Sequence, residues 1–594
     1  MASDYWNKWW QLRSNRRRFL QTSAATGVGA AGIALVGCGD DDDDDDDNGG
    51  GLQPTATSAP DATPTPMSSV TRGGTLNLEL TGDPPSIDPY GSPNFQAKAV
   101  GTFVYARLYK LGTGPGIPGA EALPVPDLAE SAEHVDDLTW TVKLRPGVVF
   151  QNKAPVNGRA LSTDDIEFSW ARATDPAQAN AGRLNSAISS IDFPDDSTIT
   201  FALTAPNAEF LDLLADTNLL QIQPTEADGG FNPAEEMIGS GPWIFERYVP
   251  SSEFVWAKNP DWYMASEGFP IVDGIHHAII PEYASRLAQF RAGNTHISGI
   301  NANDLVDLVN DIDGVILRGT VAQLMSFFYW SDINDTSVPW SNEMVRKAIS
   351  MAIDRDDIMD LGYNTQALID AGIDVSTAWN NLIPAGMTRW WIDPQGPDQG
   401  DSAELFQYNP DGARAMLEAA GYDDSNPLTF TYQYPAAIYG STFNSIAESH
   451  VLYFEDIGIQ PQSDVQDYTS VYFPQTFAGN FSGLAFGYET PFPAGGAYPQ
   501  RFFTENSLNH SKVNDPDMIA LTMQQQQETD EEARKEIFAE IQRKNAEKGY
   551  YFPSQAGAGT GWAAFQPNVH HEDIQTTGYG TGTEELPFYW IETA

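Results

Sequence analysis

Hydrophobic and polar residues alternate over short stretches of the chain, with the period of a strand that has one buried face. The clearest stretch is Gly73–Leu80, which reads GGTLNLEL. A second covers Thr139–Leu144 and predicts a hairpin-like strand. Between them, the proline-rich segment Asp83–Pro89 is predicted to be an extended turn, because residues that precede proline avoid the helical region.

Further along, hydrophobic residues recur at the three-to-four-residue spacing of an amphipathic helix. A helix is predicted to begin at the N-cap Ser162 and to run through Trp170. Three more helices are predicted over Asn342–Met359, with Val345, Ile349, Ala352 and Ile353 on one face, from Asn409-Pro410 to Gly421, and over Asp530–Lys548. Because strands and helices alternate irregularly, we expect an α/β or α+β chain with mixed sheets.

The first 37 residues have the organisation of an export signal. A basic stretch, Arg13–Gln21, precedes the weakly apolar Thr22–Gly37, which is too short and too weakly hydrophobic for a comfortable membrane span. Arg16, Arg17, Phe19 and Leu20 resemble the twin-arginine export motif, and Leu35-Val36-Gly37-Cys38 resembles a bacterial lipobox. This resemblance implies that Cys38 is the lipid-modified first residue of the mature protein. The alternative is an uncleaved N-terminal anchor with a free cysteine.

Residues 38–71 are predicted to be a disordered tether. Asp40–Asp47 is an unbroken acidic run, and Asn48–Thr71 is rich in Gly, Pro, Thr and Ser. Like charges repel and extend the chain, and few large apolar residues are present to offset the entropy of ordering. The acidic run could also bind cations loosely.

Charge and cysteine content exclude several classes of protein. The 594 residues include 81 acidic and 32 basic side chains, a formal net charge of −49. Because nucleic-acid binding requires basic surfaces, we expect no nucleic-acid partner. The single cysteine rules out an intramolecular disulfide and a cysteine-based zinc site.

The chain shows no pattern of catalytic residues. It contains no His-Glu-x-x-His, no Gly-x-Ser-x-Gly and no phosphate-binding P-loop. The pairs His276-His277 and His570-His571 are adjacent residues, which point apart on a strand or a helix and rarely bind one metal together. We therefore expect a protein that is not an enzyme, with no cofactor and no metal site.

From residue 72 to about 550, a series of short motifs resembles the family 5 solute-binding proteins, the oligopeptide, dipeptide and nickel receptors of ABC importers. No single motif is specific, but their order is. They are Gly73–Leu76, Asp83–Pro89, Asp127–Ser131, Trp140–Phe150, Leu161–Trp170, Gly239–Trp243, Asn259–Tyr263, Arg286–Ile297, Val345–Arg355, Tyr408–Pro410, Leu417–Tyr422 and Ile457–Ile459.

The resemblance implies a two-lobed α/β fold of the periplasmic-binding-protein type (type II, the large class), with mixed sheets and a two-strand hinge. Lobe I would cover 72–327, with an extra subdomain at about 111–230. The C-terminal residues 550–594 would return to lobe I. Lobe II would cover 328–549. The aromatic run Ser326–Trp330 lies at the expected crossover between the lobes.

The resemblance also points to a binding site. In peptide-binding relatives an Asp that follows an aromatic–Gly stretch pairs with the peptide ammonium, and the corresponding segment here is Ala485–Phe492. Glu489 is the candidate for that role, and the alternative is an exposed loop acid. The candidates for the cleft wall are aromatic: Tyr488, Phe486, Trp330 and Tyr329.

Together these features predict a lipid-anchored receptor on the outer face of the cytoplasmic membrane. It would capture a peptide or another small solute between its lobes and deliver it to the permease subunits of an ABC importer, and we expect a monomer. The ligand class stays open among oligopeptide, dipeptide, sugar oligomer and metal chelate. The alternative is an exported sensor, chaperone or hydrolase built on the same fold.

Overall fold

The computed structural model describes residues 70–92, 95–114, 123–178, 180–320, 325–436, 439–489, 492, 494–504, 509–553, 561–570 and 583–592. By its contacts the chain divides into two units, Met1–Ala62 and Thr63–Ala594, and all of the described residues belong to the second. The predictions for Arg16, Arg17, Phe19, Leu20 and Cys38 lie outside the described residues.

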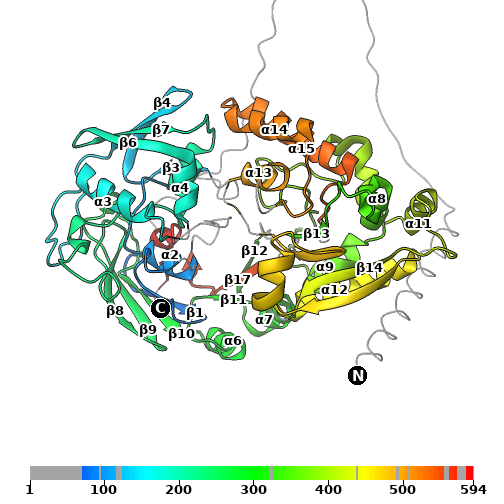
Figure 1. Ribbon diagram of the computed structural model, residues 1–594. Helices are drawn as coiled ribbons and strands as arrows, with labels where there is room; N and C mark the ends of the chain where they lie inside the picture. The colour runs from blue at the N-terminus through cyan, green and yellow to red at the C-terminus, as the bar shows by residue number, and fades with distance from the viewer. Residues whose placement is uncertain are drawn as a thin grey trace, which may run out of the picture. The chain divides into compact units, whose positions relative to one another are not determined.

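The first sheet is mixed and contains the strand that opens the body of the protein. Its order is β1-β10-β9-β8, with β1 parallel to β10 and the other neighbours antiparallel (Figure 1). The strands are β1 (Thr75–Leu80), β8 (Trp243–Val249), β9 (Glu253–Lys258) and β10 (Gly274–Ile279). The strand predicted within Gly73–Leu80 is confirmed as β1, and its alternation has the expected cause, because Leu76 and Leu78 are buried in the core of this sheet.

A separate antiparallel sheet lies within residues 111–230, and its core also includes Tyr90, Ala106, Leu108 and Tyr109. Its order is β4-β5-β7-β6, and β4 and β5 form the predicted hairpin. The elements in and beside it are β2 (Tyr109–Leu111), β3 (Pro124–Pro126), β4 (Ala129–Asp136), β5 (Thr139–Leu144), α3 (Thr163–Ala173), α4 (Ala181–Ala187), β6 (Ile188–Asp195), β7 (Thr198–Leu203) and α5 (Phe210–Ala215). The helix predicted after Ser162 is confirmed as α3.

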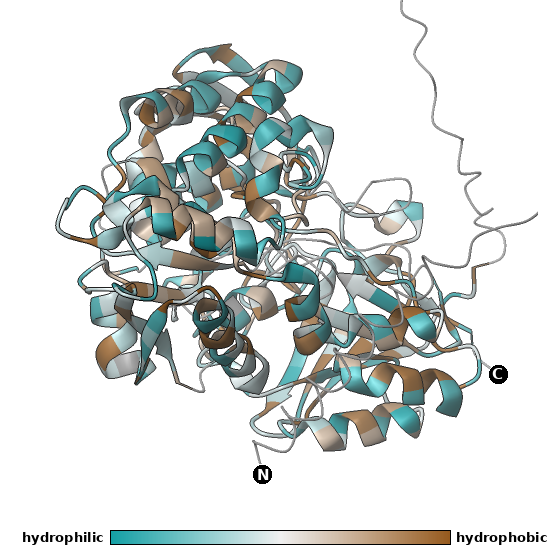
Figure 2. Ribbon diagram, turned by 90° about the vertical axis from the view of Figure 1, so that its right-hand side faces the viewer, coloured by the Kyte–Doolittle hydropathy of each residue, from teal (hydrophilic) through white to brown (hydrophobic). Residues whose placement is uncertain are grey.

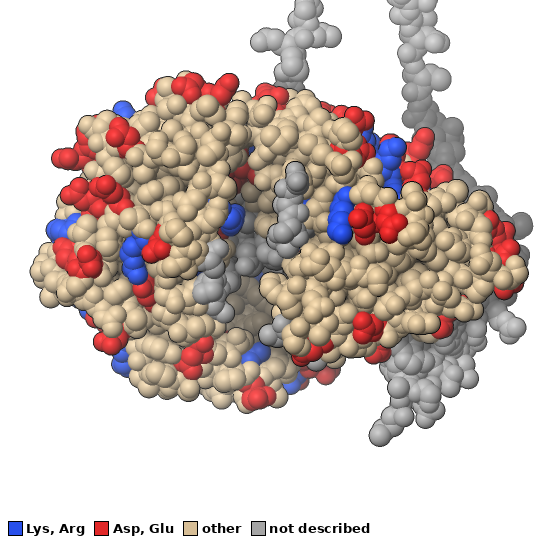
Figure 3. All heavy atoms as spheres, in the orientation of Figure 1, with Lys and Arg blue, Asp and Glu red and all other residues tan. Residues whose placement is uncertain are grey.

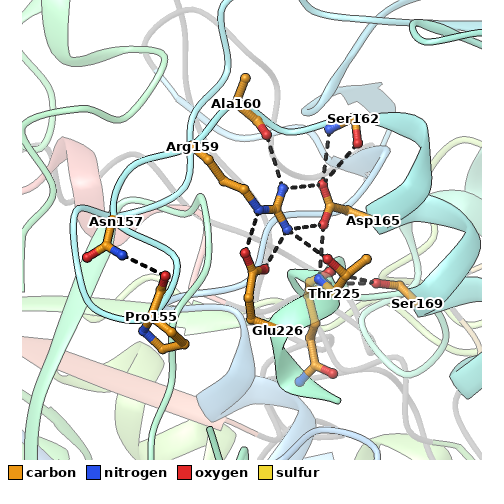
Figure 4. Close-up of polar contacts among 10 residues, drawn as sticks. Pro155, Asn157, Arg159, Ala160, Ser162, Asp165, Ser169, Thr225 and Glu226 are labelled. Carbon is orange, nitrogen blue, oxygen red and sulfur yellow. Dashed lines mark hydrogen bonds and ion pairs between the residues drawn. The ribbon is translucent and has the colours of Figure 1, made fainter. Parts of the chain in front are cut away.

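A charged cluster inside this region fixes the loop before α3 (Figure 4). The Arg159 guanidinium pairs with the buried carboxylate of Asp165 at 2.6 Å and with Glu226 at 2.6 Å. Asp165 also accepts the backbone N–H groups of Ser162 and Thr225, both at 3.0 Å. The hydrogen bonds from Arg159 lower the pKa of Glu226. All of these partners belong to one region, so the cluster stabilises it internally.

A second mixed sheet, with a separate core, has the order β13-β16-β14-β15. β14 is parallel to both β15 and β16, whereas β13 is antiparallel to β16. The strands are β13 (Ser326–Trp330), β14 (Thr429–Pro435), β15 (Gln460–Gln466) and β16 (Leu484–Tyr488). The prediction of mixed sheets is therefore confirmed.

The remaining helices carry both hydrophilic and hydrophobic residues, and many helical ribbons in Figure 2 are banded in the two colours. They are α2 (Phe95–Gly101), α6 (Tyr283–Arg291), α7 (Leu305–Asp311), α8 (Glu343–Met351), α9 (Arg355–Tyr363), α10 (Thr365–Asp370), α11 (Pro410–Ala419), α12 (Gly440–Asp456), α13 (Ala497–Phe503), α14 (Pro516–Gln527) and α15 (Glu531–Lys548). Two of these confirm the helices predicted after Asn409 and Asp530, whose side chains cap α11 and α15.

The predicted continuous helix over Asn342–Met359 is wrong. The structure has two helices, α8 and α9, because the Asp354 side chain accepts the N–H of Asp357 and caps a new helix. The predicted apolar face is nevertheless buried: Val345, Ile349 and Ile353 are fully inaccessible. A buried stripe thus continues across a break in the backbone.

A third sheet brings distant parts of the chain together. Its order is β11-β17-β12, with bounds β11 (Ile297–Gly299), β12 (Ile316–Thr320) and β17 (Gly561–Phe565). A short pair, β18 (Val569–His570) and β19 (Trp590–Ile591), follows. Where the chain passes between β12 and β13 and back again, Phe327 forms an antiparallel bridge with Pro553, and Phe328 N–H donates to Phe552 O at 3.3 Å. The exact lobe boundaries, 72–327, 328–549 and 550–594, stay predictions.

Candidate ligand-binding site

The carboxyl ends of three parallel strands meet at one edge of the second sheet. β14, β15 and β16 all run in the same direction and end at Pro435, Gln466 and Tyr488. β13 starts at this same edge, where Ser326 lies opposite Tyr488. β12 of the third sheet precedes β13 in the chain, so the chain enters the second sheet at this edge. In open α/β sheets, ligands bind at the carboxyl ends of the strands.

Glu489 lies directly after β16 at this edge, and it is not an exposed loop acid. Its side chain is fully buried, with Oε1 2.6 Å from Arg501 Nε and Oε2 3.3 Å from His510 Nε2. Its backbone N–H donates to Met325 O at 2.8 Å. A buried carboxylate is costly unless it is paired, and Arg501 supplies the opposite charge.

Aromatic rings enclose this charged cluster. The His510 ring lies 4.4 Å from that of Tyr329 and 4.7 Å from that of Phe477, and the Arg501 guanidinium lies 5.4 Å from the Phe477 ring. Burial raises the pKa of the Tyr329 hydroxyl well above its usual range, and the negative charge of Glu489 raises it further. Tyr329 Oη is buried and has no hydrogen-bond partner among the described residues. The arrangement gives a buried polar cluster packed among aromatic rings, hereafter the aromatic chamber.

The predicted wall residues occupy two different environments. Tyr329 lies in the chamber, and Tyr488 is half-buried at the end of β16, 4.9 Å from the ring of Tyr439. Phe486 and Trp330 are fully buried in the core of the second sheet. The assignment of these residues and of Glu489 as ligand contacts stays a prediction.

Sequence reasoning missed Arg501 and His510. Both lie well beyond the Ala485–Phe492 segment, Arg501 on α13 and His510 in the loop that precedes α14. No local pattern announces their contact with Glu489. The only signal is that Arg501 and His510 are among the few basic or histidine residues in the stretch that follows the candidate acid.

Close packing behind the site restricts one position on β16. Tyr472 Oη donates to Phe486 O at 3.0 Å, and a Cβ atom at Gly487 would overlap with Tyr472 Oη. Glycine at this position therefore lets the tyrosine approach the strand.

Two further kinds of feature are absent from the part of the chain that the structure describes. Within it, no group of three or more His, Cys, Asp or Glu side chains is arranged to hold a metal ion. Within the same residues, no helix is long and apolar enough to cross a membrane.

The separate mixed α/β sheets, each with its own core, have the architecture of the two-lobed periplasmic binding proteins. The structure of the ABC transporter-associated periplasmic binding protein DppA from Helicobacter pylori, in complex with the peptide STSA, has this fold. It superposes with a TM-score of 0.65 at 21% identity, over 88% of this chain and 99% of that one. The predicted fold class is confirmed.

The family follows from the sequence. Residues 124–510 match the profile described as bacterial extracellular solute-binding proteins, family 5 (middle), and this chain belongs to that family. The resemblance seen in the ordered motifs is thereby confirmed.

Two curated relatives are similar over about half of this chain. The di/tripeptide-binding protein 2 of Pseudomonas aeruginosa is 28% identical over 336 residues, which cover 52% of this chain and 58% of the relative. The dipeptide-binding protein of Escherichia coli is 28% identical over 345 residues, 54% of this chain and 58% of the relative. In both comparisons less than two thirds of the relative's length is matched.

Proposed function

We propose that this protein is the ligand-capturing receptor of an ABC importer and that its ligands are peptides. The observation that carries the proposal is the family match over residues 124–510, together with the names of the relatives, which bind di- and tripeptides. A cleft that closes around its ligand exploits the ligand's greater affinity for the closed state.

In this proposal the ligand binds at the carboxyl edge of β14, β15 and β16. Main-chain groups of an extended peptide can pair with strand ends, as an added strand does. Tyr488 and Tyr329 would contact the peptide, and Glu489 would meet its ammonium group. Because Arg501 already pairs with Glu489, the carboxylate would have to share its charge between the guanidinium and the ligand.

We further propose that a lipid on Cys38 holds the protein at the outer face of the cytoplasmic membrane. The order of basic stretch, apolar stretch and Leu-Val-Gly-Cys in residues 13–38 supports this location. The acidic run Asp40–Asp47 would then keep the binding domain away from an anionic lipid surface.

The test is calorimetric titration of the full chain with peptides of two to five residues, a sugar oligomer and a metal chelate. We expect saturable binding of peptides with no turnover, and mass spectrometry of the mixture would reveal any hydrolysis. Binding of the sugar or the chelate alone would overturn the choice of ligand, and peptide cleavage would favour a hydrolase. For the anchor, Cys38→Ser should move the protein from the membrane fraction to the soluble fraction.

A further inference from the structure

A second buried charge contact joins the two parts of the fold that flank the proposed cleft. Glu209 is the N-cap residue of α5, in the region of the small antiparallel sheet. Its Oε1 lies 2.7 Å from Arg534 Nη2 on α15 and accepts the backbone N–H of Gly496 at 2.8 Å. Glu209 thus reaches across to two elements that lie far away in the sequence.

Burial distinguishes this contact from an ordinary surface ion pair. The side chains of Arg534 and Glu209 are 5% and 10% exposed. Beside them, the backbone N–H of Ala208 donates to Gln526 O at 2.8 Å. Charge-assisted hydrogen bonds shielded from water are stronger than exposed ones.

The Arg534 side chain is held in position by neighbouring residues other than Glu209. Its Nε donates to Gln525 O at 2.8 Å, and its guanidinium lies 4.7 Å from the ring of Trp390. This side of the contact is therefore preorganised, so the carboxylate of Glu209 can enter or leave without rebuilding the site around Arg534.

The contact between Glu209 and Arg534 also lies at the edge of a cavity. This cavity has a volume of about 280 Å³ and is lined by residues on both sides of the contact, among them Thr204, Asn207 and Asp212 on one side and Ala497, Gln500 and Gln526 on the other. A continuous apolar core would resist separation, whereas a few polar contacts beside a cavity can open and exchange with water.

We propose that Glu209, Gly496 and Arg534 form an interlobe latch, which favours the closed arrangement of the lobes through contacts within the chain alone. The latch adds its free energy to that supplied by a ligand, so it sets how much of the protein is closed before a ligand binds. The inference rests on the proposed closing motion but on no particular ligand.

The experiment measures the distance between the lobes by pulsed electron spin resonance, in the full chain and without peptide. Spin labels are attached at Asp137→Cys, in the turn between β4 and β5, and at Glu418→Cys, on α11, in a Cys38→Ser background, so that they occupy the only thiols. Both label positions are exposed.

We expect Glu209→Gln to lower the ratio of closed to open molecules by at least about tenfold, because a neutral amide in place of a buried paired carboxylate deprives Arg534 of its ion-pair partner. Arg534→Gln should act in the same direction, and the double variant should differ little from the single ones. The matched control is Glu226→Gln, which breaks an ion pair within one region, with Arg159, and should leave the distances unchanged.

A second variant, Gly496→Ala, tests the latch even if Glu209→Gln fails to fold. Gly496→Ala keeps every charge, but the added Cβ would lie 2.8 Å from both Glu209 Oε2 and Gln525 Oε1, so it should displace the carboxylate and likewise shift the distances toward the open state. Identical distance distributions for Glu209→Gln, Gly496→Ala and Glu226→Gln would overturn the latch. The distance measurement contains no peptide, so its result does not depend on the proposed ligand. Failure of every peptide to bind in the calorimetric titration would refute the proposed ligand and not the latch.

Discussion

Arg501 Nε lies 2.6 Å from Oε1 of Glu489, and neither side chain is more than 9% exposed. This pair stands at the carboxyl edge of the second sheet, where the chain enters that sheet. It gives the proposed site a charge that is already balanced, which distinguishes it from a site with a lone carboxylate. A ligand ammonium would therefore compete with, or add to, the guanidinium.

Loss of the guanidinium should be costly. Arg501→Gln leaves the Glu489 carboxylate buried without its main partner, and we expect the free energy of unfolding to fall by about 3–5 kcal/mol. Urea denaturation followed by tryptophan fluorescence measures the change. Arg414→Gln, which removes surface ion pairs with Asp411 and Asp456 and exposed hydrogen bonds to Asp456 O, serves as the control and should have little effect. An equal loss in both variants would contradict the assigned burial of the pair.

Loss of the carboxylate should reveal whether the ligand uses it. If Glu489 meets a peptide ammonium, Glu489→Gln should weaken binding of a free-amine peptide by about 2–5 kcal/mol. The same peptide with an acetylated amino terminus should lose much less affinity. Calorimetric titration of both peptides into wild type and variant gives the comparison. Equal losses for the two peptides would reject Glu489 as the ammonium partner.

Asp212 should make stability depend on pH. Burial, aided by the negative charge of Glu209, raises the pKa of its carboxyl to about 7, although Arg389 and Arg534 oppose the rise. Since this pKa lies above that of the unfolded chain, near 3.9, the folded state binds the proton more tightly between these values, so stability falls as pH rises from about 4 to 7.

Replacing Asp212 with asparagine removes that penalty. Asp212→Asn should therefore raise the melting temperature at pH 8, while at pH 4 and below the wild-type and variant proteins should melt alike. Thermal unfolding at the two pH values checks this, with the exposed Asp228→Asn as a control. A gain of the same size at both pH values would show that the effect is not electrostatic.

Gly487 should tolerate no side chain while Tyr472 keeps its hydroxyl. Gly487→Ala overlaps with Tyr472 Oη, so we expect a loss of about 1–3 kcal/mol in the free energy of unfolding. Tyr472→Phe removes the obstructing oxygen, and in the double variant part of the loss should be recovered. Chemical denaturation of the three variants tests the coupling, and strictly additive losses would disprove the contact.

The local elements of this fold could be predicted from the sequence, because their signals are local. Asp530 and Asn409 cap helices within four residues of themselves, and the alternating Leu76 and Leu78 report burial directly. The break between α8 and α9 escaped prediction because the apolar stripe continues across it, whereas the cap at Asp354 acts on the backbone alone.

The candidate site could be predicted only in part. The resemblance pointed to Glu489, but its partners Arg501 and His510 reach it through tertiary packing that no local spacing encodes. The same holds for Glu209 and Arg534, which are separated by more than 300 residues. The surface shown in Figure 3 carries many acidic groups beside fewer basic ones. Because most carboxylates of this chain belong to no binding site, an acidic residue in the sequence does not by itself indicate one.

The place of β17 has a consequence for the order in which the chain can fold. This strand, Gly561–Phe565, is the central member of its sheet and pairs with both β11 and β12. Until synthesis passes residue 565, β11 and β12 have no strand between them and present open edges, which favour aggregation. Completion of this sheet must therefore await synthesis of residue 565, long after β11 and β12 have been made, so folding of this region lags behind its own synthesis.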